Sequence, residues 1–285
     1  MPPALSCALT PIAPLALGLV LLAACFHAGW NLLLHETSDR VAAMAVAGLV
    51  AGAGLLPFTL AAPPWRVWPL VLLSGVAEAA YALFLTAAYQ RGALAVAYPI
   101  GRGTAPVLVT LGAWLVLAQR PGALTLLGAA LLLAGLSLVA LAGHRAGQLA
   151  AAGFAVLTGC AIAAYSVIDA RAVGTVGVAP LAYLGPVLAV DGALLLLWMR
   201  VWRGWKGAGW ARVRAAARPG LRIAIGSVAA YALVLFAFQR AGAGRIATLR
   251  ELSVLLGVFF SRGRRGWQVW LGASLVVAGM VLTAL

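Results

Sequence analysis

Long apolar runs fill most of this 285-residue chain and constrain its fold more than any other feature. A helix needs about 20 apolar residues to cross the hydrocarbon core of a bilayer, which is about 30 Å thick. Ten runs have about this length, at residues 15–34, 42–62, 68–89, 93–117, 124–142, 150–169, 180–199, 223–240, 243–260 and 267–285. The sequence therefore predicts an all-α integral membrane protein with ten transmembrane helices.

Charged residues are scarce, and most of the basic ones lie between the apolar runs. Hydrophobic residues make up 64% of the chain and charged residues 9%, which is too little charge for a soluble domain. A net charge of +14 would indicate nucleic-acid binding in a soluble protein. In loops between spans, however, Lys and Arg set the topology and contact anionic lipid. We therefore expect a multi-pass protein of the cell inner (cytoplasmic) membrane, with membrane lipids rather than nucleic acid as partners.

The fourth run contains an irregular stretch, Tyr98-Pro-Ile-Gly-Arg-Gly-Thr-Ala-Pro106. Proline removes a backbone donor and glycine loosens a helix, so the stretch predicts a helix break at Pro99, Gly101, Gly103 and Pro106. In lipid such a break persists only where protein or a water-filled cavity covers it. Arg102, at the same depth, is expected to face inward and to be paired. This stretch predicts the wall of a polar pathway through the membrane.

Polar residues also occur inside the first run. His27 and Asn31 are four residues apart and therefore share one face of a helix, with Trp30 beside them. Two interpretations stay open. The side chains form hydrogen bonds to neighbouring helices, which is common in membrane bundles, or they line the pathway.

Acidic residues inside the runs are further functional candidates. Glu78 lies near the middle of the third run with Tyr81 on the same helix face, and Asp191 lies near the centre of the seventh run. A carboxylate at mid-membrane is a candidate functional group, although Glu78 as a structural partner of Arg102 is the alternative. Asp169 lies near the end of the sixth run, four residues after Tyr165 and on the same helix face. An interfacial or capping charge is the favoured interpretation there, with a ligand-binding role as the alternative.

The second half of the chain repeats the first. Four segments recur in the same order at offsets of 144 to 150 residues: Tyr81-Ala-Leu as Tyr231-Ala-Leu, Gln90-Arg91 as Gln239-Arg240, Arg102-Gly-Thr-Ala-Pro106 as Arg250-Glu-Leu-Ser-Val254, and the stretch 128–135 as 272–279. Trp30-Asn31 matches Tyr165-Ser166 in the same way. Because five spans per copy is an odd number, the copies would insert with opposite topology, as in secondary transporters whose site lies near the midplane. The sequence predicts two inverted five-helix repeats, residues 1–145 and 146–285, around a central cavity.

These matched segments resemble the EamA-type, ten-span branch of the drug/metabolite transporter (DMT) superfamily. The resemblance rests on His27-Ala-Gly-Trp-Asn31, the stretch 98–106, the segment 250–254 and the paired small-residue spans. It implies a secondary transporter of small metabolites, often an exporter of amino acids or related compounds. It also implies a cavity lined by the first, third, fourth, sixth, eighth and ninth spans. Positions that match the motif residues are Trp30, Asn31, Tyr98, Arg102, Tyr165, Arg250 and Glu251. The chain departs from the family where a Gly-Glu-Arg turn is usual, since Ala118-Gln-Arg120 and Ser261-Arg-Gly263 occupy those places.

Charge balance inside the membrane indicates the kind of substrate. Glu78, Asp191 and Glu251 oppose Arg102 and Arg250, so one negative charge is left over, and a proton or a cationic substrate would balance it. Our hypothesis is that Glu78 or Asp191 carries a coupling proton or binds a substrate ammonium group. Arg102 or Arg250 would bind a substrate carboxylate, and an amphoteric compound such as an amino acid fits both ends.

The candidate cavity residues are His27, Trp30, Asn31, Glu78, Tyr81, Tyr98, Arg102, Tyr165, Tyr231, Arg250 and Glu251. We expect no cofactor, no metal and no enzymatic activity, because the sequence has no metal-ligand cluster and no nucleophile paired with a base. Two other functions stay open. One is a flippase for a lipid or lipid-linked sugar, and the other is an intramembrane lipid-modifying enzyme with His27 and Glu78 as acid and base.

Orientation and oligomeric state are less constrained. Loops after odd-numbered runs hold 13 of the 20 basic residues, and this bias alone places both termini outside. The family resemblance implies cytoplasmic termini instead. The glycine faces of residues 128–135 and 272–279 are expected to pack the two halves together rather than to form a homodimer, and both a monomer and a homodimer stay open.

Overall fold

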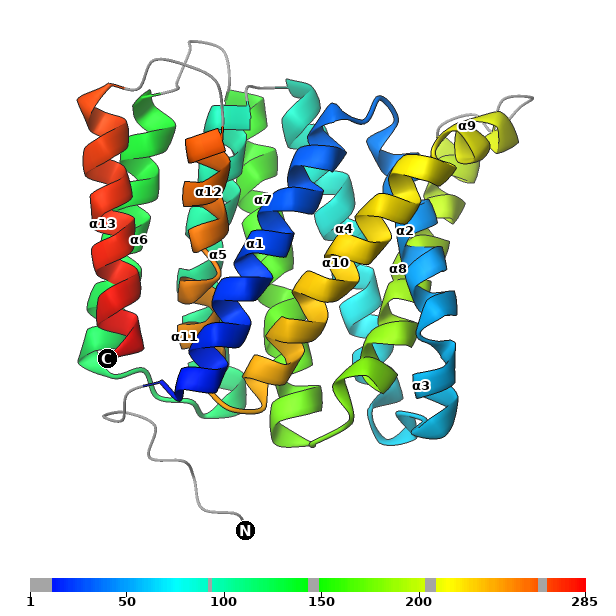
Figure 1. Cartoon of the computed structure of the whole chain (residues 1–285), viewed down its shortest axis with the longest axis horizontal. Helices are drawn as coiled ribbons and strands as arrows, with labels where there is room; N and C mark the ends of the chain where they lie inside the picture. Colours follow the sequence, from blue (N-terminus) through cyan, green and yellow to red (C-terminus); the bar gives the residue numbers. More distant parts are fainter. Residues whose placement is uncertain (1–11, 92–93, 143–148, 203–208, 261–265) are drawn as a thin grey trace.

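The computed structural model describes residues 12–91, 94–142, 149–202, 209–260 and 266–285, without the side chains of 94–99, 142 and 257–260. Over these residues the chain is helical and contains no strand. The helices are α1 Pro14–Glu36, α2 Arg40–Gly54, α3 Leu56–Ala61, α4 Trp68–Arg91, α5 Leu94–Leu117, α6 Ala123–Ala142, α7 Leu149–Asp169, α8 Pro180–Trp202, α9 Gly209–Ala215, α10 Ala217–Phe238, α11 Ala243–Leu249, α12 Leu252–Phe260 and α13 Trp267–Ala284 (Figure 1). A 3₁₀ turn, Trp65–Val67, precedes α4, and a π-helix, Ala170–Thr175, continues α7.

Eight helices within the described residues are long and apolar enough to cross a membrane. They are Pro14–Glu36, Trp65–Arg91, Ile100–Leu117, Ala123–Leu141, Leu149–Thr175, Pro180–Trp202, Ala217–Phe238 and Trp267–Ala284. Large apolar side chains such as Leu115 and Leu149, 80% and 84% exposed, lie on the outer surface of the bundle, where lipid rather than water suits them. The chain is therefore a multi-pass, all-helical membrane protein, and that part of the prediction is confirmed.

The two remaining predicted spans are interrupted helices. In the run 42–62, α2 ends at Gly54 and α3 begins at Leu56 with Pro57 in its first turn. In the run 243–260, α11 and α12 are separated by a tight turn at Arg250 and Glu251, where Ser253 N donates to the carbonyl of Arg250 at 3.2 Å. Pro57 is the sequence signal for the first interruption, and the match of segment 250–254 to the irregular stretch in the first half is the signal for the second.

The helix break predicted in the fourth run is not present. Helix α5 is continuous through Pro99, Gly101, Gly103 and Pro106. The hydroxyl of Thr110 donates to the Pro106 carbonyl one turn earlier in the same helix at 2.8 Å, a bond that Thr commonly forms inside helices.

The two glycines of this stretch are packing positions. A Cβ on Gly101 would lie 3.1 Å from the carbonyl oxygen of Ala155 in α7, and one on Gly103 would lie 3.1 Å from Cβ of Leu136 in α6. They allow α5 to approach its neighbours closely rather than loosening it. The side chains of Tyr98 and Pro99 lie outside the described residues.

Helices distant in sequence pack in pairs. The main partners are α6 with α13, α2 with α8, α1 with α10, and α7 with both α4 and α5; α6 and α13 stand side by side at one end of the bundle (Figure 1). A Cβ on Gly128 or Gly135 would lie 2.5 Å from the carbonyl oxygen of Gly279 or Gly272, respectively. Small residues permit such close crossings in membranes, and the prediction that these glycine faces meet within one chain is confirmed.

Candidate functional site

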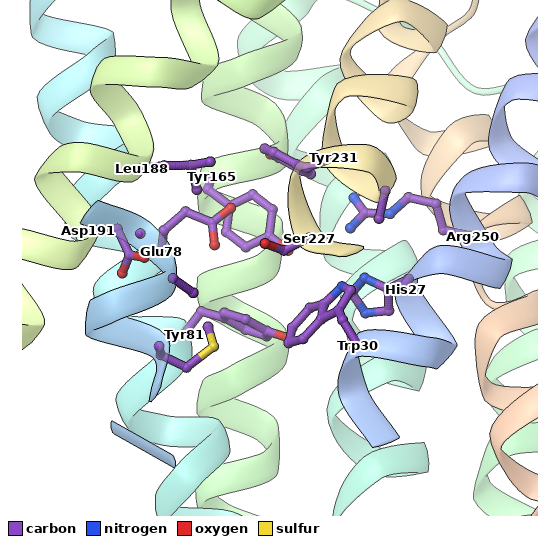
Figure 2. Close-up of a pocket in the computed structure, with 14 residues that line it drawn as sticks. His27, Trp30, Glu78, Tyr81, Tyr165, Leu188, Asp191, Ser227, Tyr231 and Arg250 are labelled. Atoms are coloured by element: carbon purple, nitrogen blue, oxygen red, sulfur yellow. The ribbon is translucent and has the colours of Figure 1, made fainter. Parts of the chain in front are cut away.

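A cavity lies between α1, α2, α4, α7, α8 and α10 and reaches Arg250 in the turn between α11 and α12 (Figure 2). The centre of a water molecule can occupy about 50 Å³ of it. Since one water needs roughly 10–15 Å³ by this measure, the cavity in this conformation holds a few waters at most. Its charged and aromatic lining residues are His27, Trp30, Glu78, Tyr81, Tyr165, Asp191, Tyr231 and Arg250.

Opposite charges lie at opposite ends of this cavity. Figure 2 shows Glu78 of α4 beside Asp191 of α8 at one end, with Arg250 and His27 at the other. Asp191 is 4% exposed, and its Oδ1 has no hydrogen-bond partner among the described residues. The indole Nε1 of Trp30 also lacks one. Buried polar atoms without partners are rare in proteins, so both atoms have capacity to bind water or a ligand.

Aromatic rings form the wall between the two ends. Tyr165 meets Tyr81 and Tyr231 edge to face, with ring centroids 5.9 and 5.6 Å apart. Trp30 packs against His27 in the same way at 4.9 Å. The guanidinium carbon of Arg250 lies 5.7 Å from the centre of the Tyr231 ring. These contacts hold the rings and the cation in fixed positions.

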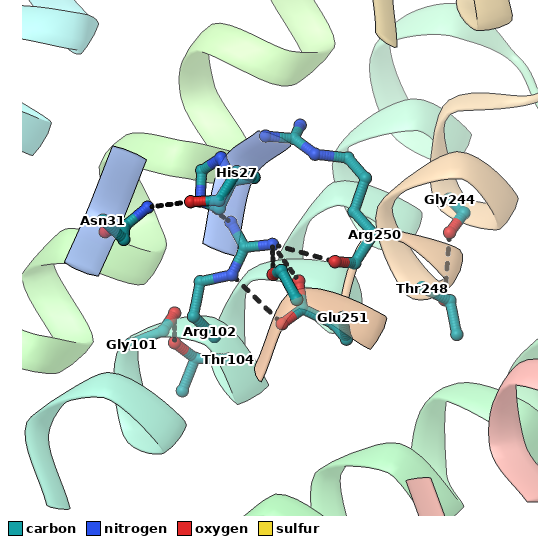
Figure 3. Close-up of polar contacts among 10 residues, drawn as sticks. His27, Asn31, Gly101, Arg102, Thr104, Gly244, Thr248, Arg250 and Glu251 are labelled. Atoms are coloured by element: carbon teal, nitrogen blue, oxygen red, sulfur yellow. Dashed lines mark hydrogen bonds and ion pairs between the residues drawn. The ribbon is translucent and has the colours of Figure 1, made fainter. Parts of the chain in front are cut away.

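Arg102 forms a separate buried cluster (Figure 3). Its Nη2 lies 2.9 Å from Oε1 of Glu251 and its Nε donates to Oε2 at 3.1 Å. Nη2 also contacts the Ser253 hydroxyl and the Arg250 carbonyl, both at 3.3 Å, and Nη1 lies 3.4 Å from Nε2 of His27. The carboxylate partner of Arg102 is therefore Glu251 and not Glu78, and the cluster fastens α5 to the turn between α11 and α12.

The predicted site residues consequently divide into two groups. Those that line the cavity are His27, Trp30, Glu78, Tyr81, Tyr165, Asp191, Tyr231 and Arg250. Arg102 and Glu251 form the ion pair beside it, and Asn31 donates to the carbonyl of His27 in its own helix at 2.9 Å. Tyr98 lies outside the described side chains.

Asp169 was not among the predicted site residues, and the expectation of an interfacial or capping charge is wrong. It is completely buried, and its carboxylate accepts hydrogen bonds from Ser74 Oγ and Tyr183 OH, both at 2.6 Å, and from the hydroxyl of Tyr231. The residue is not at a helix end because the π-helix Ala170–Thr175 follows it directly. The only signal in the sequence was its four-residue spacing from Tyr165.

The described parts of the chain contain no group of three or more His, Cys, Asp or Glu residues that could hold a metal ion.

Comparison with known proteins gives information about the fold. No family model matches the chain, and no curated protein matches it. Twenty-nine chains of solved structures match. One, described only as "Crystal structure of protein", has a TM-score of 0.69 and 20% sequence identity over 94% of this chain and 96% of that chain. At this identity the likeness shows a shared fold alone.

Proposed function

We propose that the protein is a secondary transporter of a small metabolite that works by alternating access, with ten membrane crossings arranged as two inverted five-helix repeats. We further propose that it belongs to the EamA-type branch of the DMT superfamily. Its helix contacts support the repeat. When each helix of a contacting pair is replaced by the helix five spans away, α4–α7 becomes α10–α1 and α2–α10 becomes α8–α4, and these pairs are also in contact. The pairs α6–α13 and α2–α8 map onto themselves, as a two-fold relation between residues 1–145 and 146–285 requires.

The observation that carries the proposal is the cavity with acids at one end and Arg250 at the other. Such a cavity within helices that cross a membrane is the expected position of a transport site. Buried charges in a membrane are costly unless they are used or paired. Glu78 and Asp191 are not part of the Arg102–Glu251 pair, so a structural role within that pair does not account for them.

The substrate class follows from the two ends. An ammonium group would lie between the carboxylates of Glu78 and Asp191, and a carboxylate would bind Arg250 and the Nε1 of Trp30. Arg102 is a weaker candidate for this role than Arg250, since Glu251 already binds its guanidinium. We therefore propose a small amphoteric compound such as an amino acid, with export as the direction that the family resemblance implies. The cavity would have to widen to admit it, because only about 50 Å³ is open to water centres here.

The test measures ligand binding and substrate transport with the purified protein. Thermal unfolding is followed in the presence of each standard amino acid, nucleosides, polyamines and sugars, since a ligand that binds the native state raises its stability. We expect stabilisation by an amino acid and uptake of that compound into proteoliposomes. The double variant Glu78→Gln/Asp191→Asn should lose both, whereas Glu36→Gln, a charge removed at the end of α1, should lose neither. Unchanged uptake by the double variant would contradict the proposed site. Stabilisation by lipids alone would favour a flippase, and turnover of a lipid would favour an enzyme.

A further inference from the structure

Asp169 joins four helices at one point next to the cavity. It lies on α7, and its hydroxyl partners come from α4 (Ser74), α8 (Tyr183) and α10 (Tyr231). It is one helical turn beyond the cavity residue Tyr165, towards the face of the bundle where α1 begins and α13 ends (Figure 1). The proposed transport site makes no use of Asp169, and Tyr231 is the member of the cluster that also lines the cavity.

The carboxylate has no cation bonded to it among the described residues, and only hydroxyl groups meet it. Ser74 from α4, Tyr183 from α8 and Tyr231 from α10 bond to it. Glu78 of α4 is close enough to repel its negative charge, and Arg250 lies on the ring of Tyr231. A buried carboxylate without an ion-pair partner is expensive in its charged form. Binding one proton removes that cost.

The hydrogen-bond pattern changes when this proton binds. A carboxylate only accepts, so all three hydroxyls must donate to it. A protonated carboxyl group carries one O–H donor, and at least one hydroxyl must then reverse its bond or leave. Two hydroxyls share Oδ1, whereas Tyr231 alone binds Oδ2. A proton on Oδ2 therefore acts directly on Tyr231.

Tyr231 connects this event to the cavity. Its ring lines the cavity, packs against Tyr165 and lies beside the guanidinium of Arg250, while its hydroxyl holds Asp169. A change in the Asp169–Tyr231 bond thus alters the position of the ring that Arg250 contacts in the cavity wall. The same bond links α7 to α10, and the bonds from Ser74 and Tyr183 link α7 to α4 and α8, so the cluster holds four helices together next to the cavity.

We propose that Asp169 is the site that binds and releases the coupling proton, and that its protonation opens the Ser74–Asp169–Tyr183–Tyr231 cluster to free α7 from α10. This rests on the proposed function and assigns the proton to Asp169 instead of Glu78 or Asp191, which are left to the substrate. One proton enters from the water on one side of the membrane, converts the carboxylate to the acid, and leaves as the same proton on the other side. No electrons move and no covalent bond other than O–H changes.

The test has two arms, both with the full chain. In the first, infrared difference spectra of the purified protein are recorded across a pH titration, because a protonated carboxyl group and a carboxylate absorb at different positions. We expect a carboxyl signal in the wild type that is absent from Asp169→Asn and present in Asp39→Asn. Asparagine keeps the size and the acceptor oxygen but does not titrate. Identical spectra for the wild type and Asp169→Asn would overturn the proposal whatever the substrate is.

The second arm measures transport in proteoliposomes with a tritiated mixture of the standard amino acids. With one proton per substrate, one unit of pH difference supports about tenfold accumulation. Asp169→Asn should exchange substrate without a gradient and fail to accumulate it, whereas Asp39→Asn should do both. Accumulation by Asp169→Asn that follows the pH gradient as in the wild type would also overturn the proposal. A wild type without exchange would refute the proposed amino-acid substrate and leave the infrared arm to decide on Asp169.

Tyr231→Phe keeps the inference testable if Asp169→Asn does not fold. This variant retains the carboxyl group and removes the hydroxyl that links it to the cavity. The infrared signal should persist while gradient-driven accumulation is lost. Accumulation at the wild-type level in Tyr231→Phe would contradict the proposed link.

Discussion

Removing one partner of the Arg102–Glu251 pair should destabilise the protein more than removing both. The two side chains are 4% and 2% exposed and meet through two contacts of 2.9 and 3.1 Å. Arg102→Met leaves the carboxylate of Glu251 buried without a cation, and Glu251→Leu leaves the guanidinium without an anion. Breaking a buried pair in this way costs about 3–5 kcal/mol.

The double variant Arg102→Met/Glu251→Leu has a different expected cost. Neither charge remains, and apolar side chains of similar size fill the space, a replacement that is often neutral in proteins. The lost hydrogen bond to Ser253 and the freed carbonyl of Arg250 retain a cost of about 1–3 kcal/mol. The double variant should therefore be more stable than either single variant.

Equilibrium unfolding in mixed detergent micelles, followed by tryptophan fluorescence, measures these differences. The partly exposed pair Arg212–Asp39, at 2.6 Å with side chains 24% and 27% exposed, is the matched control. Arg212→Met should cost less than about 1 kcal/mol. A double variant destabilised by the sum of the two single variants would refute the reasoning, because it would mean that the two charges do not interact.

The contacts described lead to three further predictions. Gly128→Leu should destabilise the α6–α13 crossing, because a side chain there would clash with the Gly279 carbonyl and Thr283. Gly18→Ala is its control in the same unfolding experiment: the space around its Cβ is open, so this variant should be neutral or up to about 1 kcal/mol more stable. Arg250→Ala should weaken amino-acid binding at least about tenfold, as expected for the loss of a charge-assisted bond; calorimetric affinities equal to the wild type would exclude Arg250 from the site. Trp30→Phe should weaken binding less, about three- to tenfold, because it removes one neutral N–H donor and retains an aromatic ring at this position.

The fold class was predictable because membrane helices obey a simple length rule. Eight of the ten apolar runs became single long helices. The contact between the glycine faces of α6 and α13 was also predictable, since close helix packing requires small residues at regular spacing. The continuity of α5 was not predictable, because Gly101 and Gly103 look like helix-loosening residues until their close neighbours in α7 and α6 are known.

The candidate site was only partly predictable. Eight of the residues singled out from the sequence line one cavity, because charged and aromatic side chains inside apolar runs were the basis on which they were chosen. The pairing of Arg102 with Glu251 and the hydroxyl cluster around Asp169 are long-range contacts, separated by 149 and up to 95 residues. Spacing within one helix carries no information about such contacts, and a buried Asp169 looks like a terminal charge until the π-helix after it is seen.

The interrupted helix α11–α12 has a consequence for energetics. Its counterpart under the proposed repeat, α5, is unbroken, and the position that corresponds to Asp169 at an offset of 135 residues is Leu34. If the two halves were identical, exchanging their shapes would produce two end states of equal free energy, open to opposite sides. Because the α11–α12 interruption and the carboxyl group of Asp169 have no counterpart at the matching positions of the other half, that degeneracy would be lifted. One facing state is then the ground state, and each 1.4 kcal/mol of asymmetry shifts the resting ratio about tenfold.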